Sequence, residues 1–316
     1  MALKVAFQMD PIEPVDIDAD SSFVLALEAQ ERGHQLFHYL PQDLSFRDGK
    51  VVAEMRTMEL RREYGNHCTM GEAKTVDVAD MDVVWLRQDP PFDMSYLSTT
   101  YLLELVHPKT LVVNNPTEVR NAPEKLSITH FSHLLPPTLI TRNVAEIKAF
   151  REEHKDIIVK PLFGNGGEGV FHLKPGDENL GSLLEMFFAR SRDPLMIQRY
   201  VPEIVHGDKR IIIVDGEPIG GINRIPEAGE ARANMHAGGK AEKVGLTDRE
   251  IAICDELRPF LKERGMIFVG IDVIGDYMTE INVTSPTGLQ ELRKFDGTNG
   301  EGLIWDAIER KYAETR

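Results

Sequence analysis

Cysteine is scarce in this sequence, which has only Cys68 and Cys254 among its 316 residues. The two do not form a CxxC motif and have no metal-ligand spacing, so the sequence argues against a disulfide scaffold and against a zinc site. We expect both thiols to be inert, in a chain that suits a reducing compartment. Tryptophan is equally rare, and Trp85 and Trp305 are expected in the core.

Basic residues are also in deficit, with 36 Lys and Arg against 51 Asp and Glu, a formal charge of −15. Nucleic acids and anionic membranes require a concentrated positive surface, so we exclude both as partners. No stretch approaches the roughly 20 apolar residues of a membrane span. The opening MALKVAFQMDP lacks the apolar core of a signal peptide. We therefore expect a cytoplasmic protein.

The first third of the sequence alternates strand-like and helix-like segments. We expect a parallel sheet with helices on its faces. No GxGxxG motif follows the first strand, so the dinucleotide fingerprint is missing from its usual place. Residues 49–78 are polar and fit no clear element. The expected strands are 3–9, 35–40, 81–87 and 111–114, and the expected helices are 21–32 and 94–106.

Beyond Pro116 the pattern changes, and we place a domain boundary near residue 122. The Gly- and Ala-rich segment 226–243 has no period and is predicted to be a long mobile loop. We therefore divide the chain into domains 1–121, 122–200 and 201–316. The helices expected in the second and third domains, with one that crosses the boundary, are 117–131, 144–154, 180–190, 248–264 and 302–312.

Three oxygen-bearing side chains interrupt two apolar strand-like runs between residues 266 and 287. Glu280 and Asn282 are two residues apart, so on a strand they leave the same face and can converge on one hard cation. Asp272 would face Glu280 if the hairpin loop had three residues, Gly275 to Tyr277, but not if it had two. We expect the three-residue loop. The alternative is an edge hairpin with solvated acids.

The segment FGNGGEGVF, residues 163–171, places four glycines between two strands. Such a turn lets backbone N–H groups approach a phosphate closely, although it is not a Walker A loop because no Gly-Lys-Ser/Thr follows. Lys160 ends the strand before the turn and could reach the same phosphates. A flexible hairpin tip, with Lys160 and Lys125 as solvated surface lysines, is the competing interpretation.

Arginines in this acidic chain suggest anion recognition, because guanidinium pairs with carboxylate or phosphate through two hydrogen bonds. Arg210 precedes the apolar run Ile211 to Val214, and Arg224 and Arg232 lie near the predicted mobile loop. Arg87 follows a strand end, where open α/β sheets place ligand contacts. Solvated surface arginines remain the alternative.

These features occur in an order that resembles the ATP-grasp superfamily. More closely, the segments MDPIEPVDIDADSS, WLRQDPPFD, GDKRIIIVDGEP, RIPEAGEARANMHAGGKAE and TEINVTSPTG resemble the prokaryotic-type glutathione synthetase family. The match runs through nearly the whole chain. It implies a mixed α/β and α+β fold, with a Rossmann-like N-terminal domain followed by a two-lobed ATP-grasp fold that grips ATP between antiparallel sheets.

The resemblance implies an ATP-dependent ligase that joins γ-glutamylcysteine and glycine into glutathione. In the family's mechanism the cysteinyl carboxylate takes the γ-phosphoryl group, and the glycine amine then displaces phosphate. Segment 226–243 would close over the acyl phosphate. Carried over to this sequence, the catalytic residues are Arg210, Lys160 and Lys125; the ATP-binding residues are Lys125, Lys160, Gly164, Asn165, Gly166, Gly167, Gln198, Arg199, Tyr200, Val201, Asp208 and Arg210; the substrate-binding residues are Arg87, Arg210, Arg224, Arg232, Asn234, Ser285 and Thr287; and the ligands of Mg²⁺ or Mn²⁺ are Asp272, Glu280 and Asn282.

Other functions stay open at this point. A different ATP-grasp ligase would share the nucleotide site and differ in its acid or amine. A nucleotide-binding module without turnover would keep the glycine turn but need neither Arg210 nor the long loop. A kinase would need a base for an alcohol near the γ-phosphate, and the sequence offers no candidate. The family resemblance also suggests a homotetramer.

Overall fold

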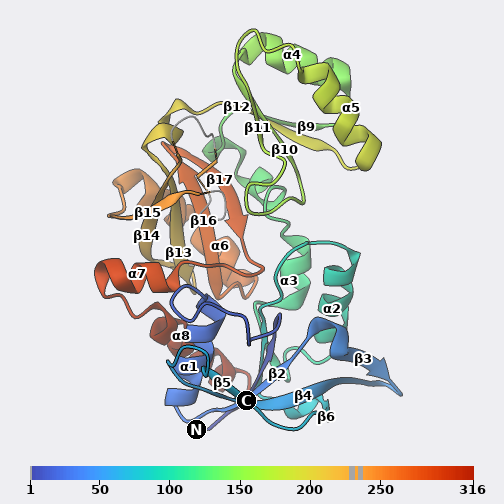
Figure 1. Ribbon diagram of the computed structural model, residues 1–316, viewed down its shortest axis with the longest axis vertical. Helices are drawn as coiled ribbons and strands as arrows, with labels where there is room; N and C mark the ends of the chain where they lie inside the picture. The colour runs from blue at the N-terminus through green and yellow to red at the C-terminus, as the bar shows by residue number, and fades with distance from the viewer. Residues whose placement is uncertain (1, 228–231, 234–237) are drawn as a thin grey trace.

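The computed structural model describes residues 2–227, 232–233 and 238–316 of the chain. The N-terminal part is built on one sheet whose central strands are parallel, in the order β2-β1-β7-β8 (Figure 1). The expected parallel sheet is therefore confirmed. Its strands are β1 (Lys4–Gln8), β2 (Gln35–Tyr39), β7 (Val83–Leu86) and β8 (Leu111–Val113), and the helices beside them are α1 (Ser21–Glu31) and α2 (Met94–Glu104).

The segment 49–78, which fitted no element by sequence, extends this sheet. It forms the long strand β4 (Lys50–Leu60), which pairs antiparallel with β2 and with short strands on both sides. Alternating burial along β4 explains its polar composition, because only one face meets the core. The short strands are β3 (Leu44–Arg47), β5 (Cys68–Met70) and β6 (Lys74–Asp77).

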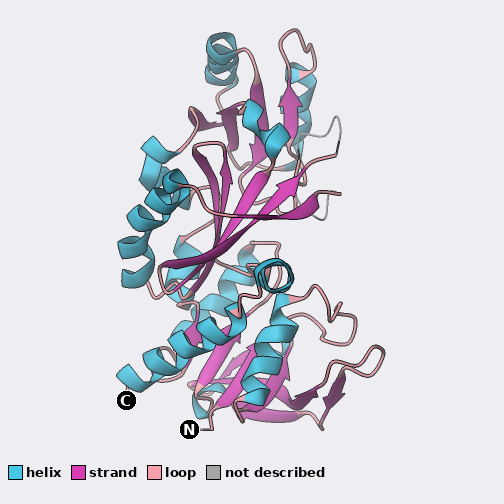
Figure 2. Ribbon diagram, turned by 90° about the vertical axis from the view of Figure 1, so that its left-hand side faces the viewer, coloured by secondary structure: helices cyan, strands magenta, loops and turns pink. Residues whose placement is uncertain are grey.

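The two ends of the chain meet in the N-terminal part. Helix α8 (Gly300–Glu314) returns from the last domain and packs against α1 (Figures 1 and 2). The indole N–H of Trp305 donates to the carbonyl of Leu25 over 2.7 Å, and both side chains are buried. The expectation of a core Trp305 is confirmed, but its partner comes from the other end of the sequence.

The second sheet is fully antiparallel, in the order β11-β10-β12-β9, with two helices packed on one face (Figure 1). Apolar residues on these helices, such as Ile147 and Leu184, close a small separate core over Ile157 and Val159. The elements are β9 (Thr138–Thr141), α4 (Val144–His154), β10 (Ile157–Pro161), β11 (Phe171–Leu173), α5 (Leu180–Arg190) and β12 (Leu195–Arg199).

The third sheet has five antiparallel strands in the order β15-β14-β13-β16-β17. Alternation along β13 explains its two covered faces: Ile211 and Ile213 meet helix α6, and Ile212 and Val214 meet α7 and α8. The elements are β13 (Asp208–Val214), β14 (Glu217–Ile225), β15 (Lys240–Val244), α6 (Asp248–Glu263), β16 (Phe268–Ile274), β17 (Tyr277–Asn282) and α7 (Leu289–Asp296).

The predicted bounds of one helix and one loop were wrong. The helix expected at 117–131 breaks into α3 (Pro116–Asn121) and a 3₁₀ helix at Ser127–Leu134, because Pro123 cannot continue an α-helix. The loop expected at 226–243 ends earlier, since β15 begins at Lys240 and pairs with β14. Residues 228–231 and 234–237 lie outside the described residues, so the mobility prediction is untested there.

The loop expected in the β16–β17 hairpin was also wrong, yet the residue pairing that followed from it is confirmed. The loop has two residues, Gly275 and Asp276, because Ile274 pairs with Tyr277. A β-bulge that inserts Thr279 then shifts the register, so that Asp272 faces Glu280. No helix within the described ranges is long and apolar enough to cross a membrane.

Candidate active site

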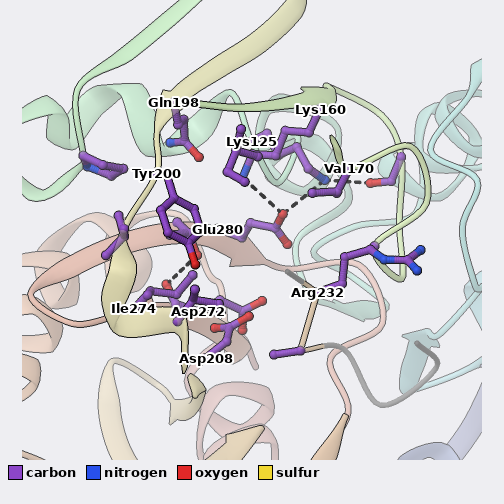
Figure 3. A pocket seen from close by; sticks show the side chains of 18 of the residues that line it. Lys125, Lys160, Val170, Gln198, Tyr200, Asp208, Arg232, Asp272, Ile274 and Glu280 are labelled. Atoms are coloured by element: carbon purple, nitrogen blue, oxygen red, sulfur yellow. Dashed lines mark hydrogen bonds and ion pairs between the residues drawn. The ribbon is translucent and has the colours of Figure 1, made fainter. Parts of the chain in front are cut away.

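A deep pocket lies between the second and third sheets and encloses about 830 Å³ of space outside the protein atoms, its open mouth included (Figure 3). Its lining brings together most of the predicted ATP-binding residues: Lys125, Lys160, Gly164, Gly166, Gly167, Gln198, Arg199, Tyr200, Val201 and Asp208, together with Arg232, Asp272 and Glu280.

Two lysines from separate elements converge on one carboxylate in this pocket. The Nζ atoms of Lys125 and Lys160 lie 3.3 and 3.7 Å from Oε1 of Glu280 (Figure 3). Burial lowers the pKa of the Lys160 amine, and Glu280 offsets this only in part. Burial also lowers the pKa of Lys125, but Glu280 and Glu124 outweigh it and raise the pKa. The solvated-lysine interpretation is therefore wrong for both.

The buried arginines form ion pairs that the strand register creates. Arg210 lies opposite Asp272 on the neighbouring strand, and its Nε and Nη2 donate to that carboxylate over 2.5 and 3.1 Å. Arg224 lies opposite Asp208 and bridges Asp208 and Asp272, at 2.7 and 3.1 Å. Such directly opposed, oppositely charged pairs stabilise a sheet. The surface-arginine interpretation is wrong for these two residues.

The acids of this network differ in their proton affinity. Burial alone would raise the pKa of Asp272, but Arg210 and Arg224 hold it well below its usual range. Burial raises the pKa of Asp208 to about 6, because Arg224 compensates only in part. One oxygen of Asp208, Oδ1, is buried without a hydrogen-bond partner. The site therefore holds a permanently charged acid beside one that titrates near neutral pH.

The candidate metal ligands lie at one edge of this charge network. Asp272 faces Glu280 across the hairpin, and the Asn282 side chain lies 3.4 Å from Oδ2 of Asp272. In the described part of the chain no three His, Cys, Asp or Glu side chains gather as a metal site. A third protein ligand would therefore be the amide oxygen of Asn282. An all-oxygen donor set fits a hard cation such as Mg²⁺ or Mn²⁺.

The glycine turn has a backbone that side chains would disturb. Gly166, Gly167 and Gly169 have φ values of 60°, 84° and 70°, which residues with a Cβ rarely adopt. The carbonyl of Gly164 accepts a 2.6 Å hydrogen bond from Nζ of Lys125, which ties the turn to the pocket. Asn165 does not line this pocket and instead borders a smaller one behind the turn.

The far end of the pocket is flatter and more apolar. Ile158, Ile204 and Ile274 line it. The Tyr200 ring stacks on His172 with centroids 4.0 Å apart, and His172 contacts Asp156 at 2.6 Å. These walls suit the planar ring of a nucleobase.

Arg199 and Gln198 are also held by side chains at this end. Arg199 donates to the Tyr277 hydroxyl over 3.0 Å, and the Gln198 amide donates to Oγ1 of Thr138 over the same distance. The contact of Arg199 with Tyr277 links the second and third sheets.

Some predicted substrate residues lie outside the pocket. Arg87 is buried between domains, where its Nε donates to Ser22 and its Nη1 to the carbonyl of Pro286, both over 2.9 Å. It therefore anchors the segment that carries half-buried Ser285 and exposed Thr287. Asn234 lies outside the described residues.

One charged residue at the site was missed by the sequence reasoning. Glu124 has a carboxylate oxygen 3.8 Å from Nζ of Lys125. Burial and the nearby Glu280 raise the pKa of Glu124 to about 7, although Lys125 and Arg210 lower it. The only sequence signal was its position beside Lys125 in Pro123-Glu124-Lys125.

Comparisons with known proteins agree with this geometry. The family model for the N-terminal domain of prokaryotic glutathione synthetase matches residues 3–120, and the model for its ATP-grasp domain matches residues 124–297. A glutathione synthetase of Mesorhizobium japonicum is 59% identical over 98% of this chain and 99% of its own length. One of Escherichia coli K12 is 44% identical, over 98% of both chains.

Solved structures support the fold. The ATP-grasp ligase PsnB, complexed with a minimal precursor, aligns with a TM-score of 0.64 at 18% identity, over 100% of both chains. D-cycloserine synthetase DcsG aligns with a TM-score of 0.67 at 15% identity, over 98% of this chain and 99% of that one. At this identity the likeness concerns the fold alone, and it is the ATP-grasp fold. With two family models spanning most of its length and close relatives aligned end to end, the chain belongs to the prokaryotic glutathione synthetase family.

Proposed function

We propose that this chain is an ATP-dependent ligase that joins γ-glutamylcysteine to glycine and forms glutathione, with release of ADP and phosphate. The observation that carries the proposal is the convergence of Lys125 and Lys160 on Glu280, next to the paired Arg210 and Asp272. Such an arrangement places cations and oxygen ligands where a triphosphate must be bound. Family membership supports the choice of substrates.

ATP would bind with its base at the apolar end and its phosphates beneath the glycine turn. Backbone groups of residues 198–201 border the apolar end, and Lys125 and Lys160 lie at the phosphate end. Phosphate oxygens would replace the contacts that both ammonium groups make with Glu280. Because both lysine side chains are almost fully buried, that attraction would be weakly screened by water.

Asp272, Glu280 and Asn282 would hold Mg²⁺ or Mn²⁺, whose charge offsets that of the phosphates when it is bound. Asp272 has a second task in this proposal. Its carboxylate holds the Arg210 guanidinium through two hydrogen bonds, so that this group would be oriented before any substrate arrives. Preorganisation of this kind avoids a reorganisation cost during the reaction.

The reaction would proceed in two displacements. An oxygen of the cysteinyl carboxylate attacks the γ-phosphorus, ADP leaves, and Arg210 stabilises the charge on the phosphoryl group in transfer. The glycine ammonium loses a proton, its free amine attacks the acyl carbon and the C–N bond forms. Phosphate leaves with the C–O electron pair, and the nitrogen releases a second proton to give the amide. Arg224 and Arg232 would bind substrate carboxylates, and Arg87, Ser285 and Thr287 would position the dipeptide.

Segment 226–243, with Asn234, would cover the acyl phosphate and keep water away from it. We further propose the domain limits 1–121, 122–200 and 201–316, a homotetrameric assembly and a cytoplasmic location. These rest on sequence composition and on the family.

The test is ADP release by the purified protein with Mg-ATP, γ-glutamylcysteine and glycine, each omitted in turn, with the tripeptide followed by mass. ADP and tripeptide that appear together only in the complete mixture would support the ligase. ADP without tripeptide would indicate another acid or amine. Binding of ATP with no ADP release in any mixture would indicate a module without turnover.

A further inference from the structure

Glu124 borders a second, smaller pocket that adjoins the reaction centre from the side of the N-terminal domain. This pocket has about 260 Å³ of space outside protein atoms, about a third of that of the nucleotide pocket. Gly164 lines both pockets, so the glycine turn, with its bond to Lys125, lies where the two pockets meet. The smaller pocket is too small for a nucleotide, so only a small group could enter it.

The chemistry of this lining is selective. Six of its eight residues, Pro90, Phe92, Pro123, Leu162, Phe163 and Gly164, offer no charged or polar side chain, and Asn165 offers an amide. Glu124 is the one charged group. Its side chain is 18% exposed, so it is not fully enclosed by the protein. A single carboxylate in apolar surroundings favours a small cation.

Among the residues that the structure describes, Glu124 also lacks a cationic partner as close as those of three other acids at the site. Asp208, Asp272 and Glu280 each have a cationic nitrogen within 3.3 Å. The nearest recorded cation to Glu124 is Nζ of Lys125, at 3.8 Å, and that ammonium lies closer to Glu280. Burial raises the pKa of Glu124, which is the expected effect where a negative charge is incompletely compensated. A cation bound close to the Glu124 carboxylate would therefore stabilise its charge.

We propose that Glu124 binds the ammonium group of the amine substrate and holds the amine at the acyl-phosphate centre. This inference rests on the proposed function. In that reaction ATP, phosphate and the carboxylates are anions, so the only organic cations are ammonium groups. A metal ion would need more oxygen ligands than the pocket offers. Two ammonium groups are available, one on glycine and one on the γ-glutamyl residue, and the small size of the pocket favours the free amino acid over the dipeptide.

The test compares Glu124→Gln with the wild-type protein and with Glu118→Gln. Glu118 lies on the neighbouring helix α3, pairs with Arg264 at 3.3 Å and is remote from both pockets, so the control makes the same chemical change elsewhere. Each protein is assayed for the KM of glycine, γ-glutamylcysteine and ATP. Each is also assayed with hydroxylamine in place of glycine, which attacks an acyl phosphate but is uncharged at neutral pH.

For Glu124→Gln we expect kcat/KM for glycine to fall about 100-fold, the typical effect of removing one partner of a buried ion pair. Hydroxamate formation from γ-glutamylcysteine and ATP should stay close to the wild-type rate, and the KM of ATP should not change. Glu118→Gln should behave as wild type in every assay.

Three results would overturn the inference. Equal loss of the hydroxamate and glycine reactions would place Glu124 with the nucleotide or with Lys125. A rise confined to the KM of γ-glutamylcysteine would assign it to the other ammonium group. If the wild-type protein forms no tripeptide from γ-glutamylcysteine, glycine and ATP, the proposed function itself fails and the inference fails with it.

Discussion

Replacing Glu280 with Gln should lower the stability of the nucleotide-free protein and raise its affinity for metal-free ADP. Glu280 neutralises both Lys125 and Lys160, at 3.3 and 3.7 Å. At an effective dielectric constant of about 20, the gross attraction to each ammonium is about 5 kcal/mol. Glutamine has the same shape but no charge, so it leaves two nearly buried ammonium groups beside each other.

The net loss of stability should be smaller than this gross attraction. Removing one partner of a buried ion pair costs about 3–5 kcal/mol. The Glu280 side chain is 19% exposed, so we take the lower end, about 3 kcal/mol. In a chain of this length that corresponds to a fall of about 5 °C in the melting temperature of the nucleotide-free protein.

ADP without metal should then stabilise Glu280→Gln more than it stabilises the wild type. In the variant both lysines have lost their shared carboxylate, and Glu280 no longer repels the phosphates. The affinity for metal-free ADP therefore rises, and ligand binding raises the melting temperature by mass action. In the wild type, Mg²⁺ should add to the stabilisation by ADP. In Glu280→Gln this additional effect of Mg²⁺ should be absent, and the variant should have no ligase activity. The measurement is the melting temperature of both proteins without nucleotide, with ADP and EDTA, and with ADP and Mg²⁺.

The reasoning would be refuted by a variant that melts like the wild type and shows the same ADP shift with and without metal. That result would mean that Glu280 neither compensates the lysines nor contributes to a metal site. A variant of Glu217, an exposed acid that pairs with Arg258 on the surface, controls for loss of a charge at a site remote from the nucleotide.

Three further predictions follow from other parts of the site. Gly270→Ala would place a Cβ 2.9 Å from Cδ of Arg210, so kcat should fall at least about tenfold while the KM of ATP stays unchanged; an unchanged kcat would show that the position of Arg210 is not critical. Because burial raises the pKa of Glu124 from 4.5 to about 7, the folded protein binds this proton more tightly than the unfolded chain, and its stabilising contribution is lost as pH rises through that range. Glu124→Gln should therefore melt higher than the wild type at pH 8 and no higher at pH 4, and a pH-independent difference would contradict the shift. Deletion of residues 229–239 should raise ATP hydrolysis relative to tripeptide formation, and unchanged coupling of the two activities would exclude a protective role for this segment.

The sequence predicted strands well where they are buried on both faces, and helices well where they have an apolar face. The period of apolar residues located the central parallel strands and most helices, and only Pro123 upset the pattern at the helix expected over 117–131. Residues 49–78 were unassigned because β4 is covered on one face only. Such a strand carries many polar residues and lacks a strong apolar signal.

The hairpin that carries Asp272 and Glu280 shows the limit of local reasoning. With a two-residue loop and regular pairing, Asp272 and Glu280 would lie on opposite faces of the hairpin. One extra residue between them brings them to the same face, and we expected that residue in the loop. The chain uses a bulge at Thr279 instead. A loop and a bulge have the same effect on register, so a pattern of period two cannot distinguish them.

What the sequence determined by itself is the kind of chemistry: a glycine turn after a lysine, oxygen ligands spaced two apart on a strand, and arginines in an acidic chain. These are local properties, set by backbone geometry and residue type. The tertiary structure alone decided which charges neutralise one another. The pairing of Arg210 with Asp272 and of Arg224 with Asp208 follows from strand register. The weak compensation of Glu124 follows from Lys125 lying closer to Glu280. Electrostatic energy depends on distance and burial, and both arise only when segments remote in sequence pack together.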